Sequence, residues 1–235
     1  MGQKVNPKSF RLLITKDWDS RWITKNLFPY MLLADKIIRE TIYKKFNNVG
    51  INRVVIERGT QELKVTIHTS RPGTIIGHSG KGILDLKKEI ENNIQTSTDF
   101  RLIQPGLDIK KVNDIKKKLI SNLKINISEI RDHDSHAQLI AQDIAAQLIK
   151  RMPYRKVIKR TISKITGNRR IKGIKISVSG RLGGVDIART EKFSSGSIPL
   201  SSMKSNVDYA YVPALTTHGV VGVKVWLHIE ETINK

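Results

Sequence analysis

The stretch VVGVKVWLHIE, residues 220–230, constrains the fold more than any other part of this chain. Apolar and polar residues alternate in it, and a period of two places side chains on opposite faces of a β-strand. The stretches 173–180 and 206–212 alternate in the same way. The sequence therefore predicts a mostly antiparallel sheet near the C-terminus. In the last stretch, one apolar face is formed by Val221, Val223, Val225, Leu227 and Ile229.

Two helices are predicted before this sheet. Ser135 is followed three residues later by Gln138, which matches a capping box and would open an Ala- and Ile-rich helix to about residue 151. Pro153 cannot lie inside that helix, but it suits the first turn of a second helix over 153–166. A layer of helices and an antiparallel sheet together predict an α+β domain.

The first half of the chain mixes helix and strand patterns. Apolar residues at helical spacing predict helices over 32–47 and 81–94. Alternating residues predict strands over 53–58, 62–68 and 123–130, and the short gap between the first two predicts a hairpin. This order of elements also favours an α+β fold.

Three parts of the chain follow from these patterns. We expect a basic N-terminal arm over residues 1–22 and a first domain over 23–131, with an insertion at about 95–122. The second domain is expected over 132–235. The fold class is therefore predicted as two-domain α+β.

Between the hairpin and the following helix lies the glycine-rich stretch RPGTIIGHSGKGI, residues 71–83. A Walker A loop would need Gly where this chain has Ile75, and Ser or Thr where it has Gly82, so an NTPase site of this kind is excluded. The stretch also lacks a G-x-G-x-x-G register, which excludes the dinucleotide fingerprint. The glycines must serve another purpose.

The run Gly77-His78-Ser79-Gly80 resembles the KH motif, whose G-x-x-G loop joins two helices and clamps a nucleic-acid backbone. Glycine at both ends leaves room for a phosphate to approach, because no Cβ stands in the way. The two residues between the glycines are uncharged, so positive charge would come from nearby side chains. We predict an RNA contact formed by Arg71, Gly77, His78, Ser79, Gly80 and Lys81.

The charge of the chain indicates a polyanionic partner. Lys and Arg number 42 against 21 Asp and Glu, which gives a net charge of +21 and a pI near 10.2. Basic groups that meet phosphates release condensed counterions, so nucleic acid is the expected partner. The absence of cysteine excludes disulfides and cysteine nucleophiles. The sequence shows no signal peptide and no apolar run of membrane-spanning length, so we expect an intracellular protein without a membrane partner.

The stretch between Ile144 and Val185 contains twelve basic residues and no acidic one. Within it, Arg155, Lys156, Lys159 and Arg160 would share one face of the 153–166 helix. A basic face that is merely solvated usually carries some Glu or Asp for pairing along the helix. We therefore interpret this stretch as lacking acidic partners and predict that it contacts phosphates.

Candidate catalytic or metal-binding groups are few. His133 and His136 lie in a segment that reads as a linker, and Asp186 with Glu191 is better explained by surface roles. We therefore predict no enzyme activity, no metal site, no cofactor and no small-molecule substrate. Four aromatic residues are of a type that stacks on bases, but most are interpreted as core or strand residues: Tyr154, Tyr209, Tyr211 and Trp226.

Several motifs together resemble one family from nearly end to end. They are MGQKVNP at the start, WDSRW at 18–22, the glycine stretch, RMPYRKVIKR at 151–160, SGRLGGVDIARTE at 179–191 and HGVVGVKVW at 218–226. The chain is similar to the bacterial-type third protein of the small ribosomal subunit. The resemblance implies a type II KH domain followed by an α+β domain in the head of that subunit.

The resemblance also implies partners and site residues. They include ribosomal RNA, mRNA where it enters the subunit, proteins ten and fourteen in contact, and proteins four and five nearby. By this resemblance Arg155, Lys156, Lys159 and Arg160 would face incoming mRNA and help to separate its duplexes. Further ribosomal RNA contacts are expected at Lys4, Lys8, Arg11, Arg169, Arg170, Lys172 and Arg181.

The resemblance places the protein in the cytoplasm of a bacterium, with an organelle-encoded ribosomal protein as the alternative. Two other functions stay open on the residues alone. One is a free-standing KH regulator of RNA, and the other is a nuclease or lyase that acts on nucleic acid. The second would need a general base or a Lys nucleophile, for which the sequence shows no constellation.

Overall fold

The computed structural model describes residues 4–24, 27–46, 49–59, 62–97, 112, 114–116, 119–120 and 122–230. The chain divides into two compact units, each with a hydrophobic core of its own. The first unit is Trp18–Arg131, and the second is Asp132–Lys235 together with Met1–Asp17. Residues 1–17 of the predicted arm therefore belong to the second unit, whereas its last residues belong to the first.

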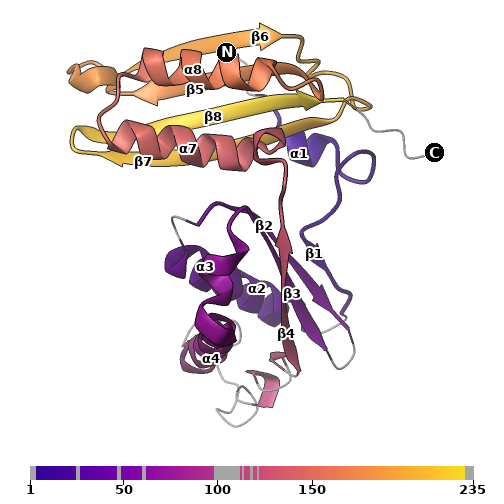
Figure 1. Ribbon diagram of the computed structural model, residues 1–235. Coiled ribbons are helices and arrows are strands. Elements are labelled where there is room, and N and C mark those ends of the chain that lie inside the picture. The colour runs from indigo at the N-terminus through magenta and orange to yellow at the C-terminus, as the bar shows by residue number, and fades with distance from the viewer. Residues whose placement is uncertain are drawn as a thin grey trace. The chain divides into compact units, whose positions relative to one another are not determined.

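The first unit packs helices against one four-stranded sheet (Figure 1). The strand order is β1-β2-β3-β4, in which β2 and β3 form the predicted antiparallel hairpin. The pairs β1–β2 and β3–β4 are parallel. The elements are β1 (Ser20–Arg21), α2 (Phe28–Lys45), β2 (Ile51–Arg58), β3 (Leu63–Thr69), α3 (Pro72–Ile76), α4 (Lys81–Thr96) and β4 (Leu123–Glu129).

The core of the first unit confirms the predicted helices and strands. Helix α2 buries Tyr30, Ala34, Ile38 and Ile42, which recur every four residues and so lie on one face. It begins at Phe28, four residues before the predicted start, with Pro29 in its first turn, where a missing N–H costs nothing. The predicted insertion at 95–122 lies mostly outside the described residues.

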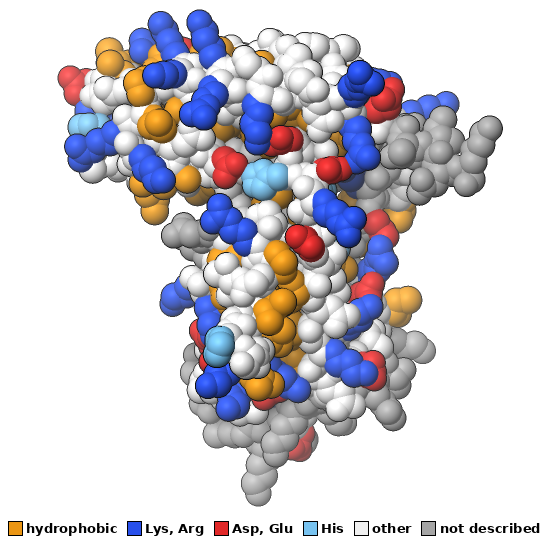
Figure 2. Space-filling model, viewed as in Figure 1, with side chains coloured by type: hydrophobic (Ala, Val, Ile, Leu, Met, Phe, Trp, Pro, Cys, Tyr) orange, Lys and Arg blue, Asp and Glu red, His pale blue; other side chains and the backbone are white. Residues whose placement is uncertain are grey.

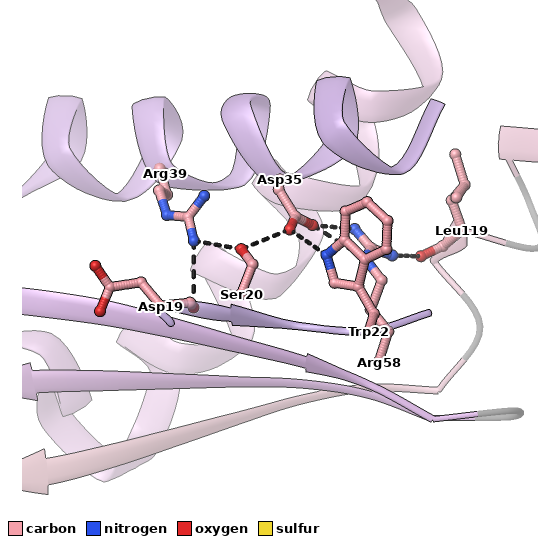
Figure 3. A network of polar contacts seen from close by, with 7 residues as sticks. All are labelled: Asp19, Ser20, Trp22, Asp35, Arg39, Arg58 and Leu119. Atoms are coloured by element: carbon pink, nitrogen blue, oxygen red, sulfur yellow. Dashed lines mark hydrogen bonds and ion pairs between the residues drawn. The ribbon is translucent and has the colours of Figure 1, made fainter. Parts of the chain in front are cut away.

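A buried polar network fastens the start of the first unit to its helix α2 (Figure 3). The guanidinium of Arg58 lies 2.6 Å from the carboxylate of Asp35, and both side chains are almost fully buried. The other carboxylate oxygen of Asp35 accepts hydrogen bonds from Ser20 Oγ at 2.9 Å and Trp22 Nε1 at 2.8 Å. The WDSRW motif is thus a structural anchor, because two of its side chains satisfy a buried carboxylate.

The second unit has an entirely antiparallel sheet of order β6-β5-β8-β7, as predicted from the alternating stretches. Helices α7 and α8 cover one face of it (Figure 1). Strand β6 escaped prediction because only Phe193 among its residues packs against the core. The elements are α1 (Pro7–Phe10), α7 (Ala137–Ile149), α8 (Tyr154–Thr166), β5 (Ile171–Gly180), β6 (Arg189–Gly196), β7 (Val207–Thr216) and β8 (Gly219–Ile229).

The predicted capping box at Ser135 is wrong. Ser135 lies in a 3-10 turn, His133–Ser135, and α7 begins two residues later at Ala137. The amide of Ala137 donates instead to the carboxylate of Asp208, at 2.9 Å. The cap therefore comes from strand β7, about seventy residues away, and a carboxylate also favours the positive end of the helix dipole.

Arg11 holds the N-terminal segment onto the second unit. Its side chain is fully buried, and its guanidinium donates to the backbone carbonyls of Ser205 at 2.7 Å, Ser202 at 2.7 Å and Pro199 at 2.9 Å. Burial lowers the pKa of Arg11. The structure therefore contradicts the prediction that Arg11 contacts ribosomal RNA, because its donors are already used inside the protein.

Candidate nucleic-acid interface

The glycine loop of the first unit joins two helices, as a G-x-x-G loop should. Helix α3 ends at Ile76, Gly77 adopts a φ of +69°, and Gly80 adopts a φ of +77° immediately before α4. His78 and Ser79, between the two glycines, are exposed. The positive φ values explain the glycines at both ends, since other residues reach them only with strain.

A third glycine, Gly82, is the tightest point of the loop. A Cβ at Gly82 would lie 2.4 Å from the carbonyl oxygen of Ile75 and 2.9 Å from that of Ile76. The first turn of α4 therefore packs directly on the backbone of α3. Sequence reasoning treated Gly82 only as a missing Ser or Thr, although a glycine inside a helical first turn already signals a close backbone approach.

The positive potential at the loop comes from the start of helix α4 as well as from side chains. Helix α4 begins without a side-chain cap and without an acidic residue in its first turn. The amide of Lys81 donates to the carbonyl oxygen of His78, and the positive end of the helix dipole, which no carboxylate of the first turn neutralises, attracts anions. The predicted Arg71 and Lys81 are exposed at the two ends of the loop.

Helix α8 of the second unit carries the predicted basic face. Val157, Ile158 and Ile165 are buried against the sheet, and this packing fixes the orientation of the helix. All four predicted basic residues are exposed: Arg155, Lys156, Lys159 and Arg160. Figure 2 views the helix-covered side of this unit and shows Lys and Arg side chains gathered over the area where Figure 1 draws α8.

Arg155 is not a free cation. Its guanidinium lies 3.2 Å from the carboxylate of Glu191 on β6, and that carboxylate also accepts a 2.7 Å hydrogen bond from the Tyr154 hydroxyl. Arg189 lies 3.7 Å from the same carboxylate. Hydrogen bonds from Tyr154 and then Arg155 lower the pKa of Glu191, and the bond to Glu191 raises the pKa of Arg155.

Other basic residues of the same stretch are also paired. Lys164 lies 2.7 Å from Asp134, Lys172 lies 2.9 Å from Glu230, and Arg181 lies 2.9 Å from Asp186. Arg170 pairs with Asp132. The interpretation that this basic stretch lacks acidic partners is therefore wrong, because the carboxylates come from outside residues 145–184 and reach it only in the folded unit.

The remaining seven cations of the stretch have no acidic partner in the described part of the chain: Lys150, Arg151, Lys156, Lys159, Arg160, Arg169 and Lys175. Three of these seven lie together on one face of α8, and we call Lys156, Lys159 and Arg160 the free α8 face. Their charge is available to an external phosphate without breaking an internal ion pair.

The N-terminal lysines divide in a similar way. Lys8 lies 3.7 Å from Asp208, the residue that caps α7, whereas Lys4 lines a cavity on the sheet of the second unit. His133 lies near the carboxylates of Asp134 and Asp143. The described residues contain no group of three metal-ligating side chains, and none of their helices is long and apolar enough to cross a membrane.

Two family models match the chain, one in each unit. A KH domain matches residues 37–135, and the C-terminal domain of ribosomal protein S3 matches residues 144–227. Small ribosomal subunit protein uS3 of Caldicellulosiruptor saccharolyticus is 42% identical over 229 residues, which covers 97% of this chain and 92% of that protein. The uS3 protein of Carboxydothermus hydrogenoformans is 41% identical over 234 residues, covering 99% of this chain and 94% of that protein.

This chain belongs to the uS3 family. The match confirms the predicted fold, a KH domain followed by an α+β domain with an antiparallel sheet. It also confirms the resemblance drawn from the sequence motifs. The uS3 family is structural and non-enzymatic, so the alternative of a nuclease or lyase is wrong.

Proposed function

We propose that this protein is a structural constituent of the small ribosomal subunit, binds the RNA of that subunit, and contacts incoming mRNA through α8. In this role phosphate contacts position the protein, and the basic helix weakens base pairs of the message as it is drawn past. The mechanism needs no nucleotide and no cofactor.

The observation that carries the mRNA part of the proposal is the free α8 face. Its three cations are exposed and lack acidic partners among the described residues, while Val157, Ile158 and Ile165 hold the helix rigid. A rigid row of positive charges attracts single strands and duplexes through their phosphates. Because its position is fixed, the face cannot follow a duplex, and strands held on it are pulled apart as the message moves.

The glycine loop supports the ribosomal RNA part of the proposal. Its helix N-terminus without a side-chain cap, its exposed tip and its glycine backbone fit a phosphodiester chain better than any side-chain ligand. We assign Arg71, Gly77, His78, Ser79, Gly80 and Lys81 to this contact. Lys4, Arg169 and the paired Lys8, Arg170, Lys172 and Arg181 are proposed as further contacts.

The relatives are bacterial small-subunit proteins, which supports placement in a bacterial ribosome and hence in the cytoplasm. The proposed neighbours are proteins ten and fourteen in contact, with proteins four and five near the site where mRNA enters. Sedimentation of a lysate on a sucrose gradient tests the placement. Migration of the chain away from the small subunit would contradict it.

Translation of structured messages tests the role of α8. Lys156→Glu with Lys159→Glu should slow translation of a message that begins with a hairpin by about two- to fivefold relative to an unstructured message, because the free cations become anions. These two positions are preferable to Arg155, whose loss would also disturb Glu191 and Tyr154.

The matched control is Lys164→Glu with Lys124→Glu. These lysines are exposed and are not among the proposed RNA contacts, and they pair with Asp134 and Glu62. The control should leave the ratio between the two messages unchanged, with both sets of subunits assembled. An equal ratio for the α8 variant and the wild type would reject the proposed role of the helix.

A further inference from the structure

The sheet of the second unit has a second face, opposite α7 and α8. The register places Tyr209 beside Trp226, and Ser177 beside both Lys192 and Lys224. Because Val223 and Val225 alternate with these residues and face the core, the polar and aromatic side chains point the other way. No acidic residue is among those the register brings to this face: Lys175, Ser177, Ser179, Thr190, Lys192, Tyr209, Tyr211, Lys224 and Trp226.

A cavity of about 740 Å³ lies on this face, between the strands and the N-terminal segment. The segment contributes Lys4, Asn6, Pro7 and Phe10, and the buried Arg11 holds it in place. The volume falls in the range of sites that take small organic groups. It is larger than the space that a single side chain needs.

The walls of the cavity combine π faces, hydroxyls and amines. The rings of Tyr209 and Trp226 lie 5.3 Å apart between centroids, and Lys175 Nζ lies 5.6 Å from the Trp226 ring. Ser177 and Ser179 supply hydroxyl groups, and Lys4, Lys192 and Lys224 supply the charge. Tyr209 and Trp226 are therefore strand residues, in agreement with the interpretation drawn from the sequence, and their rings face away from the core.

We propose that this cavity binds an unpaired nucleobase of RNA, stacked on Trp226 and Tyr209, with the lysines on the flanking phosphates. The inference rests on the proposed RNA-binding function and assigns it a third site, separate from the glycine loop and α8. Stacking on aromatic rings with lysines along the backbone is how single strands are held without sequence readout.

Charge complementarity favours RNA over a protein partner. The described residues that line the cavity include three lysines and no carboxylate, so a segment of protein would have to be acidic to be matched there. A nucleotide brings both a flat ring for the aromatic pair and a phosphate for the amines. A protein segment on this face is the competing outcome of the test.

The test measures binding of single-stranded RNA to the full-length chain. The probes are a short oligoadenylate and a strand of equal length without bases, and the signal is the indole N–H resonance of Trp226, assigned by Trp226→Phe. Oligoadenylate should shift this resonance, and the abasic strand should not. Trp226→Leu should weaken oligoadenylate binding about tenfold, the size of one stacking contact.

A second variant covers the case in which Trp226→Leu does not fold. Lys192→Gln with Lys224→Gln should also weaken oligoadenylate binding, whereas Lys36→Gln with Lys44→Gln, which removes the same charge from the first unit, should not. In assembled subunits, a photocrosslinker at Tyr211, which is 51% exposed, should react with RNA.

Three results would overturn the inference: equal shifts of Trp226 by both strands, unchanged oligoadenylate affinity in the folded cavity variants, or crosslinks from Tyr211 to protein alone. In each case, loss of binding in variants of the free α8 face would leave the proposed function standing. If the unaltered chain binds neither strand, the proposed function itself fails.

Discussion

The glycine loop and helix α8 are two different means of approaching a phosphate. In the loop, the backbone forms the surface: three glycines bring α3 and α4 close, and the tip is neutral. On α8, exposed side chains form the surface, and a buried apolar stripe only holds them in place. The comparison shows that a geometric site depends on single backbone positions, whereas an electrostatic site depends on which charges the fold leaves unpaired.

The largest effect is expected at the point where the loop is most constrained. Gly82→Ala should destabilise the first unit by about 3 kcal/mol, because the new Cβ would lie 2.4 Å from the carbonyl oxygen of Ile75. Hydrogen exchange of the α4 amides measures the loss. Gly73→Ala is the control, since its Cβ meets nothing within 4 Å, and it should be neutral or slightly stabilising. Equal exchange in the two variants would show that the loop is not built on backbone contact.

The second prediction separates charge from geometry at the tip of the loop. Gly80 has a left-handed φ of +77° and open space around its missing Cβ, so Asn and Asp both fit with similar strain. Gly80→Asp should weaken RNA contact at the loop roughly fivefold more than Gly80→Asn, because only Asp places a negative charge beside the phosphate. Footprinting of ribosomal RNA measures the difference. Identical footprints for the two variants would mean that no phosphate lies there.

The smallest effect is expected where a charge of α8 is already paired. Glu191→Gln should strengthen RNA binding only about twofold, because it releases Arg155 from a partner at the surface. Lowering the pH should also strengthen RNA binding by the wild type, because a protonated Glu191 no longer pairs with Arg155. The pKa of Glu191 is lowered, so the pairing persists as the pH falls and is lost only when the pH passes below that lowered value. Titration of RNA affinity against pH, in the variant and the wild type, checks this, and a larger gain in the variant at low pH than at neutral pH would contradict it.

Sequence patterns predicted most of the fold because they depend on near neighbours. The periods of α2 and β8 and the glycine spacing are local, and each produced the expected element. Strand β6 was missed because an edge strand with one half-buried Phe193 has no apolar pattern to detect. The cap of α7 was misassigned because its acceptor, Asp208, is supplied by another strand.

The sequence predicted where the basic residues gather but not which of them are paired or buried. The basic composition indicated α8, yet only the folded unit shows that carboxylates pair with Arg155 and Lys164 of this helix and with Lys172 of the following strand. Arg11 was counted as a surface cation from its type alone, although it is fully buried on backbone carbonyls. Which charges are free is a property of tertiary structure, because an ion pair joins residues far apart in sequence.

The salt dependence of RNA binding tests the central claim most directly. Two triple variants remove the same charges: Lys156→Gln, Lys159→Gln and Arg160→Gln from the free α8 face, and Lys164→Gln, Lys124→Gln and Arg21→Gln from paired positions that are not proposed as RNA contacts. The slope of log affinity against log salt should become shallower by about two in the first variant, at roughly 0.7 to 0.9 per lost phosphate contact, and change by less than about one in the second. Equal changes in slope would contradict the claim that the unpaired cations of α8 make the phosphate contacts.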